Sequence, residues 1–100
     1  MSLYAIIGRD RDNSLEARMK VRAEHLARVR ELMAEGRLVV AGPFLRVDAD
    51  EASQAGFNGS LIVAEFDTLD EAKRWTEQDP YVTSGVFSSL EVQPFMQVLP

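Results

Sequence analysis

The first part of the chain combines a short apolar run with a long segment of helical periodicity. Residues 3–8 (LYAIIG) are apolar on both faces of a strand, which is typical of a strand that is covered on both sides. A helical pattern then continues to Gly36, a residue type common just past a helix end. At its start, Asn13 and Ser14 offer N-cap oxygens, and Glu16 lies at capping-box spacing from Asn13.

The middle of the chain predicts two strands joined by a long acidic loop. Residues 38–46 have strand composition, and Gly42 and Pro43 belong at an edge or a bulge because proline donates no ladder hydrogen bond. Residues 60–66 (SLIVAEF) predict the next strand. The connection, residues 47–59, is longer than most hairpin loops and predicts either a mobile lid or a disordered tip.

The last third of the chain predicts a second helix and a closing strand. Thr68 and Glu71 form a capping box for a helix that ends near Gln78. Residues 79–85 (DPYVTSG) predict a turn or a short helical turn, and residues 86–98 alternate apolar and polar side chains as a strand does. This order of elements, β-α-β-β-α-β, predicts an α+β fold of the ferredoxin-like type: an antiparallel sheet with both helices on one face.

The same pattern predicts a partner for the other face of the sheet. The first three predicted strands are apolar on both faces, and a chain of 100 residues leaves roughly a third of its unfolded surface exposed after folding. We therefore expect a homodimer that buries this face. The chain contains no repeat and no linker, so residues 1–100 are expected to form a single domain.

Composition excludes several classes of partner. The net charge of −5 argues against a nucleic-acid-binding face, and no apolar run approaches the roughly 20 residues of a membrane span. The chain opens without a signal-peptide pattern, which favours the cytoplasm. There is no cysteine and one histidine, so we expect neither a disulfide nor a metal site. The Arg9-Asp10-Arg11-Asp12 sequence is predicted to be a solvated loop, and no phosphate loop indicates an organic cofactor.

One face of the long helix mixes apolar and cationic side chains. On a wheel of about 100° per residue, an apolar stripe is formed by Leu15, Met19, Leu26 and Met33, with Val29 and Leu32 beside it. Arg22 lies within this stripe, and Arg18 and His25 lie on the side of Val29. In one interpretation the arginines extend to solvent and His25 makes one hydrogen bond at the rim. In the other, Arg22 and Arg18 hold an anionic or carbonyl substrate in a pocket, where His25 moves a proton.

Asp79 is the second candidate for chemistry. The sequence Asp79-Pro80 predicts an N-cap for a short helical turn that ends at Gly85. A carboxylate fixed in this way can also accept the imidazole N–H of His25 and select its tautomer. Capping and support of the histidine are compatible roles.

Three further polar or aromatic residues are considered as parts of the pocket or of a packing contact. Tyr4 and Ser60 lie at strand starts and are predicted to line the pocket with their hydroxyls. Trp75 lies off the apolar stripe of its helix. It is predicted to pack at the flank of the helix or in a subunit contact rather than against a ligand.

Several runs along the chain together resemble the YciI-like family. They are RAEHL (22–26), EGRLVVAGPF (35–44), GSLIVAEF (59–66), DPYVTSGVF (79–87) and LEVQPF (90–95). The resemblance implies a dimeric α/β barrel, in which two ferredoxin-like sheets pack face to face, and an active-site pair that matches His25 and Asp79. Related barrels include muconolactone isomerase-like enzymes and cofactor-free oxygenases. The loop at residues 47–57 is long for the family, which would reshape the entrance to the pocket.

Three functional hypotheses follow. In the first, the chain is an enzyme of the lyase, isomerase or hydrolase type that acts on a small cyclic or anionic substrate without a cofactor. His25 is then the general base or acid, Asp79 orients it, and Arg22 binds a substrate oxygen. In the second, the chain is a non-catalytic dimeric binding or accessory protein that holds a small anion on Arg18 and Arg22. In the third, it is a purely structural dimer.

Overall fold

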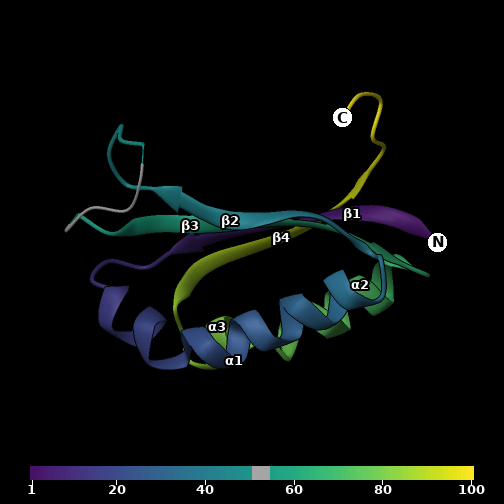
Figure 1. Ribbon diagram of the computed structural model, residues 1–100. Coiled ribbons are helices and arrows are strands. Elements are labelled where there is room, and N and C mark those ends of the chain that lie inside the picture. The colour runs from purple at the N-terminus through teal and green to yellow at the C-terminus, as the bar shows by residue number, and fades with distance from the viewer. Residues whose placement is uncertain (51–54) are drawn as a thin grey trace.

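The computed structural model describes residues 1–50 and 55–100 as an antiparallel sheet with the helices packed on one face (Figure 1). The elements are β1 (Ser2–Asp10), α1 (Leu15–Ala34), β2 (Leu38–Leu45), β3 (Phe57–Phe66), α2 (Leu69–Glu77), α3 (Pro80–Thr83) and β4 (Phe87–Phe95). The strand order is β2-β3-β1-β4, and each neighbouring pair is antiparallel. The predicted ferredoxin-like α+β fold is therefore confirmed. None of the helices in the described part of the chain is long and apolar enough to cross a membrane.

The boundaries of two strands differ from those that the sequence pattern predicted, because pairing with the neighbouring strand determines where each one begins or ends. β3 begins at Phe57 rather than at residue 60, because Phe57 still pairs with Leu45 of β2. The final strand was predicted to reach residue 98 but ends at Phe95, which pairs with Leu3 near the start of β1. Beyond that point β1 has almost no residues left to pair with.

The predicted loop over residues 47–59 is only partly described. Its last three residues belong to β3, while residues 51–54 lie outside the described residues. The prediction of a lid or a disordered tip thus falls on a segment that the structure does not describe. Pro43 and Gly42 lie on β2, which is an edge strand as predicted.

The two predicted helix caps have different outcomes. Thr68 caps α2 as expected, and its hydroxyl accepts a hydrogen bond from the Glu71 N–H at 3.1 Å. Ser14 occupies the N-cap position of α1 but makes no side-chain cap hydrogen bond. Its hydroxyl instead donates to Asp10 Oδ2 at 2.6 Å. The capping box predicted between Asn13 and Glu16 is wrong, because the N-cap is Ser14 and Glu16 lies only two residues after it. The Ser14 hydroxyl does not cap the helix either, because it is bound to the buried carboxylate of Asp10.

α1 is rotated relative to the orientation that its apolar stripe predicts. Leu15, Met19 and Met33 of that stripe are 40%, 54% and 59% exposed. The residues that α1 buries are Arg18, His25, Val29 and Leu32. The helix turns these two polar side chains inward because both find hydrogen-bonding partners, Arg18 on the sheet and His25 at the start of α3.

The hydrophobic core lies between the sheet and the helices. It is formed by Tyr4, Ile6, Val29, Leu32, Ile62, Ala64, Phe66 and Ala72. Tyr4 was predicted to line a pocket, but its ring packs in this core at 6.3 Å from the ring of Phe66. Trp75 is half-buried at the flank of α2, with its ring 5.8 Å from Phe66, in agreement with its predicted position.

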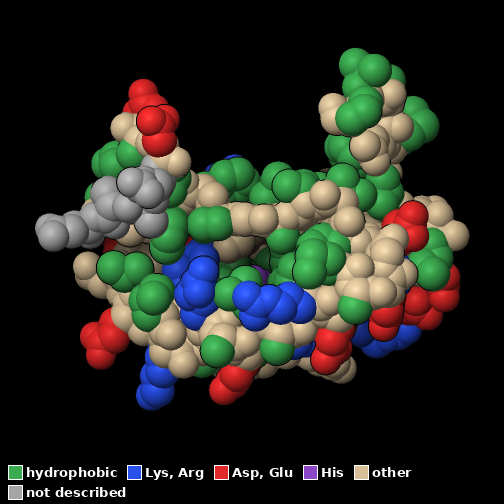
Figure 2. Space-filling view, in the orientation of Figure 1, with side chains coloured by type: hydrophobic (Ala, Val, Ile, Leu, Met, Phe, Trp, Pro, Cys, Tyr) green, Lys and Arg blue, Asp and Glu red, His purple; other side chains and the backbone are tan. Residues whose placement is uncertain are grey.

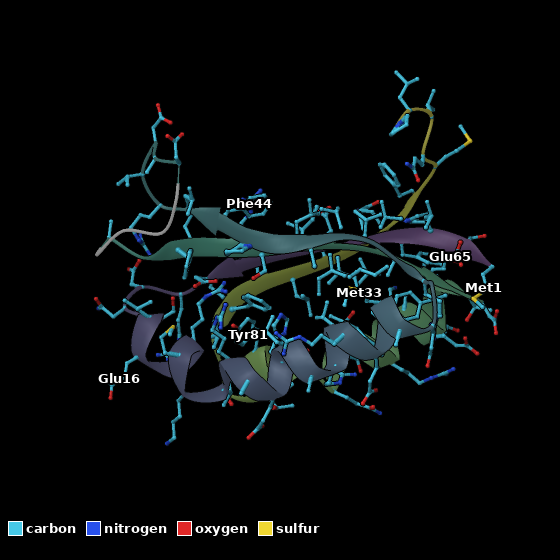
Figure 3. All side chains as sticks on the ribbon, viewed as in Figure 1. Met1, Glu16, Met33, Phe44, Glu65 and Tyr81 are labelled. Atoms are coloured by element: carbon cyan, nitrogen blue, oxygen red, sulfur yellow. The ribbon has the colours of Figure 1, made fainter. Side chains whose placement is uncertain are left out.

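In the described part of the chain no helix covers the opposite face of the sheet, which carries partly exposed apolar side chains (Figure 1). Phe44 lies on the side of the sheet away from the helices (Figure 3). Val40 and Phe95 are 49% and 45% exposed. Ile7 and Leu61 face each other across the β1–β3 ladder on the same side. Residues 46–50 after β2 and the C-terminus rise on this side (Figure 1), so the uncovered face lies between two projections.

Asp10 fastens the end of β1 to α1. Its carboxylate is fully buried and accepts from Arg18 Nε at 3.0 Å and from Arg18 Nη2 at 2.8 Å. The same guanidinium donates to the Gly59 carbonyl at 3.0 Å and to Ser60 Oγ at 2.9 Å on β3. The prediction of a solvated loop at Asp10 is therefore wrong. This buried ion pair joins three elements.

Replacing Asp10 should be costly because it strands a buried cation. We expect Asp10→Asn to lower the free energy of unfolding by about 3–5 kcal/mol, since removing one partner leaves the Arg18 charge uncompensated. Urea unfolding followed by Trp75 fluorescence measures the change. Asp12→Asn, at an exposed position of the same sequence motif, is the control and should stay within about 0.5 kcal/mol of the wild type. Equal effects of the two substitutions would contradict the role of Asp10.

Candidate functional site

A cleft of about 230 Å³ lies between α1 and the edge strand β2, with β3 at its base. Its lining residues are Arg18, Arg22, His25, Leu26, Val29, Ala41, Gly42, Pro43, Phe57, Ser60, Leu61, Ile62 and Tyr81. Figure 2 shows basic side chains gathered beside the hollow between the sheet edge and α1. Apolar walls with a few convergent polar groups are typical of a small-molecule site.

His25 is held by Asp79 at the inner wall of the cleft. Asp79 occupies the N-cap position of α3, as predicted, and its Oδ2 accepts from the Tyr81 N–H at 3.0 Å. The same oxygen lies 2.8 Å from His25 Nδ1. Both side chains are buried. A carboxylate at this position favours the tautomer with the proton on Nδ1, which leaves Nε2 with its lone pair.

Tyr81 supports the histidine from α3. Its ring stacks on the His25 ring with centroids 3.9 Å apart and planes at 12°, and Arg18 Cζ lies 4.7 Å from the Tyr81 centroid. Tyr81 lies between α1 and the sheet (Figure 3). Burial raises the pKa of Tyr81 above its usual value, against the opposing effect of the Arg18 charge. The phenol therefore stays neutral near neutral pH, while its ring restricts rotation of the imidazole.

The cations of the cleft differ in how they are paired. Arg18 is bound to Asp10, so its charge is compensated. Arg22 lines the cleft and is exposed, and within the described part of the chain it has neither a hydrogen bond nor an ion pair. Arg22 is thus the group available to an incoming anion.

The structure brings together five of the six predicted site residues. Arg18, Arg22, His25 and Ser60 line the cleft, and Asp79 lies directly behind the histidine. Tyr4 is the exception and belongs to the core.

Sequence reasoning missed three residues that shape the site. Tyr81 was noted only within a motif, although its place two residues after an N-cap aspartate brings it next to that carboxylate. Arg28 lies one helical turn after His25 and binds the other oxygen of Asp79 at 3.0 Å. Asp10 was assigned to a loop, whereas its position at the end of an apolar strand was a signal of burial.

The raised pKa of Tyr81 predicts an alkaline loss of stability. A folded state that holds this proton more tightly than the unfolded chain is fully stabilised below the unfolded value of 10.0 and loses stability as the pH rises above it. We expect the free energy of unfolding to fall less between about pH 8 and about pH 10.5 in Tyr81→Phe than in the wild type. Urea unfolding at both pH values measures the difference, and identical losses would refute the prediction.

Comparisons of sequence identify the relatives of this chain. The model of the YCII-related domain matches residues 2–96. Protein YciI of Escherichia coli is 47% identical over 96 residues, which are 96% of this chain and 98% of that protein. A protein of Haemophilus influenzae is also 47% identical, over 95% of this chain and 97% of its own length.

A solved structure with the same fold carries a ligand. It is TftG, a 5-chloro-2-hydroxyhydroquinone dehydrochlorinase from Burkholderia phenoliruptrix AC1100, in complex with 2,5-dihydroxybenzoquinone. The TM-score is 0.83 at 30% sequence identity, and the match covers 94% of this chain and 93% of TftG. Together with the domain match over nearly the whole length, these likenesses show that the chain belongs to the YCII-related (YciI-like) family.

Proposed function

We propose that the chain is an acid–base enzyme that works without an organic cofactor on a small ring substrate that carries one negative charge or acquires it on a ring oxygen during the reaction. The observation that carries the proposal is the buried hydrogen bond of 2.8 Å between His25 Nδ1 and Asp79 Oδ2, with the imidazole at the wall of a cleft. A histidine supported by a carboxylate is a common general base. Asp79 orients the ring and stabilises the imidazolium that forms when Nε2 takes a proton.

The charges of the cleft favour a monoanionic substrate. Arg18 is neutralised by Asp10, and Arg28 is paired with Asp79. Arg22 is then the one cleft-lining arginine without an ion pair among the described residues. It would hold a substrate oxygen, while the apolar walls from α1 and β3 would contact the ring.

The likeness to TftG favours a lyase among the reaction types that acid–base chemistry allows. TftG is named as a dehydrochlorinase of a chlorinated hydroxyhydroquinone. In an elimination of this type on the present chain, His25 would take a proton from the substrate, and the electron pair of the broken bond to hydrogen would form a new double bond of the ring system. The bond to the leaving group breaks, and chloride departs to solvent, so that the net change is the loss of HCl. Arg22 would stabilise the negative charge on the ring oxygen as it forms.

We further propose that the chain is a homodimer whose subunits pack through the uncovered face of the sheet. Val40, Phe44 and Phe95 lie on this face, half-buried or exposed. A contiguous apolar patch is typical of a subunit interface. A second sheet on this face would complete the α/β barrel implied by the family.

The assembly is tested by placing a charge in this face. We expect the wild type to sediment with the mass of a dimer and Val40→Asp to sediment as a monomer, because an aspartate would be desolvated in the interface. Met19→Asp is the control, since Met19 is exposed on α1, on the other side of the sheet. A monomeric wild type, or a dimer that tolerates Val40→Asp, would contradict this arrangement.

The catalytic role of His25 is tested with 5-chloro-2-hydroxyhydroquinone as substrate and chloride release as the measured signal. Proton transfer by a positioned side chain contributes about 10²- to 10⁴-fold in rate, so His25→Ala should lower kcat/KM by about that factor. Circular dichroism verifies that the variant is folded. Full turnover by a folded His25→Ala variant would contradict the assignment of His25 as the general base.

Binding of 2,5-dihydroxybenzoquinone separates an enzyme from a binding protein. We use Arg22→Met and His25→Gln, with Arg30→Met as the control because Arg30 is exposed on the same helix. Loss of binding in both site variants supports a shared site. Loss in Arg22→Met alone, without turnover by the wild type, would favour the non-catalytic anion-binding protein.

A further inference from the structure

Arg28 is bound between the Asp79 carboxylate and α2. Its Nη1 donates to Asp79 Oδ1 at 3.0 Å, and its Nη2 donates to the Trp75 carbonyl at 2.7 Å. The guanidinium also stacks on the indole, with Cζ 4.2 Å from the Trp75 ring centroid. Contacts on two sides leave Arg28 little freedom, although 21% of its side chain remains exposed.

Asp79 binds different groups with its two oxygens. Oδ2 accepts from His25 and from the Tyr81 N–H, while Oδ1 accepts from Arg28. The carboxylate is therefore held at both oxygens and cannot rotate away from the histidine without breaking its bond to Arg28.

We propose that Arg28 is a positioning residue that sets the basicity of His25 by compensating the charge of the Asp79 carboxylate, which also orients the imidazole. This inference deepens the proposed function and rests on it. A carboxylate with no other partner would strongly favour the imidazolium form of the histidine beside it. Because Arg28 already compensates the charge of Asp79, the carboxylate favours the imidazolium less, while its orienting hydrogen bond is kept.

The other charges around His25 do not replace this effect. On α1, Arg18 is compensated by Asp10, and Arg22 adds a positive charge at the exposed side of the cleft. On α3, Tyr81 carries no charge near neutrality. The cleft-lining residues from β2 and β3 are all uncharged. Asp79 is thus the anion in direct contact with His25, and Arg28 is the cation bound to its other oxygen.

The NMR titration of His25 tests this inference without any substrate. The chain has one histidine, so its ring signals need no assignment. We expect the titration midpoint of Arg28→Gln to lie about half a pH unit or more above that of the wild type, because the uncompensated carboxylate then stabilises the imidazolium. Arg28→Lys, which keeps the charge, should return the midpoint most of the way.

Controls separate charge from packing. Arg30→Met, on the exposed side of α1, should leave the midpoint unchanged. Arg28→Met is the second neutral variant, to be used if Arg28→Gln does not fold, and it should give the same upward shift. An unchanged or lowered midpoint in the folded neutral variant would overturn the inference, as would failure of both neutral variants to fold, since Arg28 would then be a structural residue.

This measurement distinguishes the inference from the function on which it rests. An upward shift in Arg28→Gln without turnover of any test substrate would leave the electrostatic role in place and remove the catalytic one. If turnover depends on His25 but the titration midpoint of Arg28→Gln is unshifted, the proposed enzymatic function stands and the proposed role of Arg28 is excluded. The pH profile of kcat/KM provides a second reading, because its acid limb should move with the NMR midpoint.

Discussion

The structure depends on two buried aspartates that bind polar side chains of α1. Asp10 holds Arg18, and Asp79 holds His25 and Arg28. A buried charge is very costly unless it is paired and hydrogen-bonded, so these pairs must form if the helix presents its polar side chains to the sheet. These pairs determine which face of α1 packs against the sheet. The apolar stripe alone would have predicted a different face.

Each aspartate is itself fixed by the backbone. Asp10 is the last residue of β1, and Asp79 is the N-cap of α3, so both carboxylates are positioned by elements whose geometry is set locally. The long side chains of α1 reach these two anchors from one helix. As a result the cleft is assembled from a helix, a sheet edge and a short turn that are distant in the sequence, yet its polar groups are held at defined positions.

Pairing also decides which charges remain available to a ligand. The compensated Arg18 and Arg28 contribute hydrogen bonds and packing, including stacking on Tyr81 and Trp75. Arg22 lines the cleft without an ion pair to any residue that the structure describes. A site with several cations can therefore be suited to a single negative charge, and the histidine can be oriented by a carboxylate whose charge is shared.

Local patterns in the sequence were sufficient for the order of the elements, the Thr68 and Asp79 caps, and the edge position of Pro43, because propensity, capping and periodicity act within a few residues. They also brought His25, Asp79 and the arginines of α1 forward as candidates. The rotation of α1, the burial of Asp10 and the roles of Tyr81 and Arg28 were decided only by the tertiary structure. These features depend on which polar groups meet across elements, and hydrophobic periodicity carries no information about such partners.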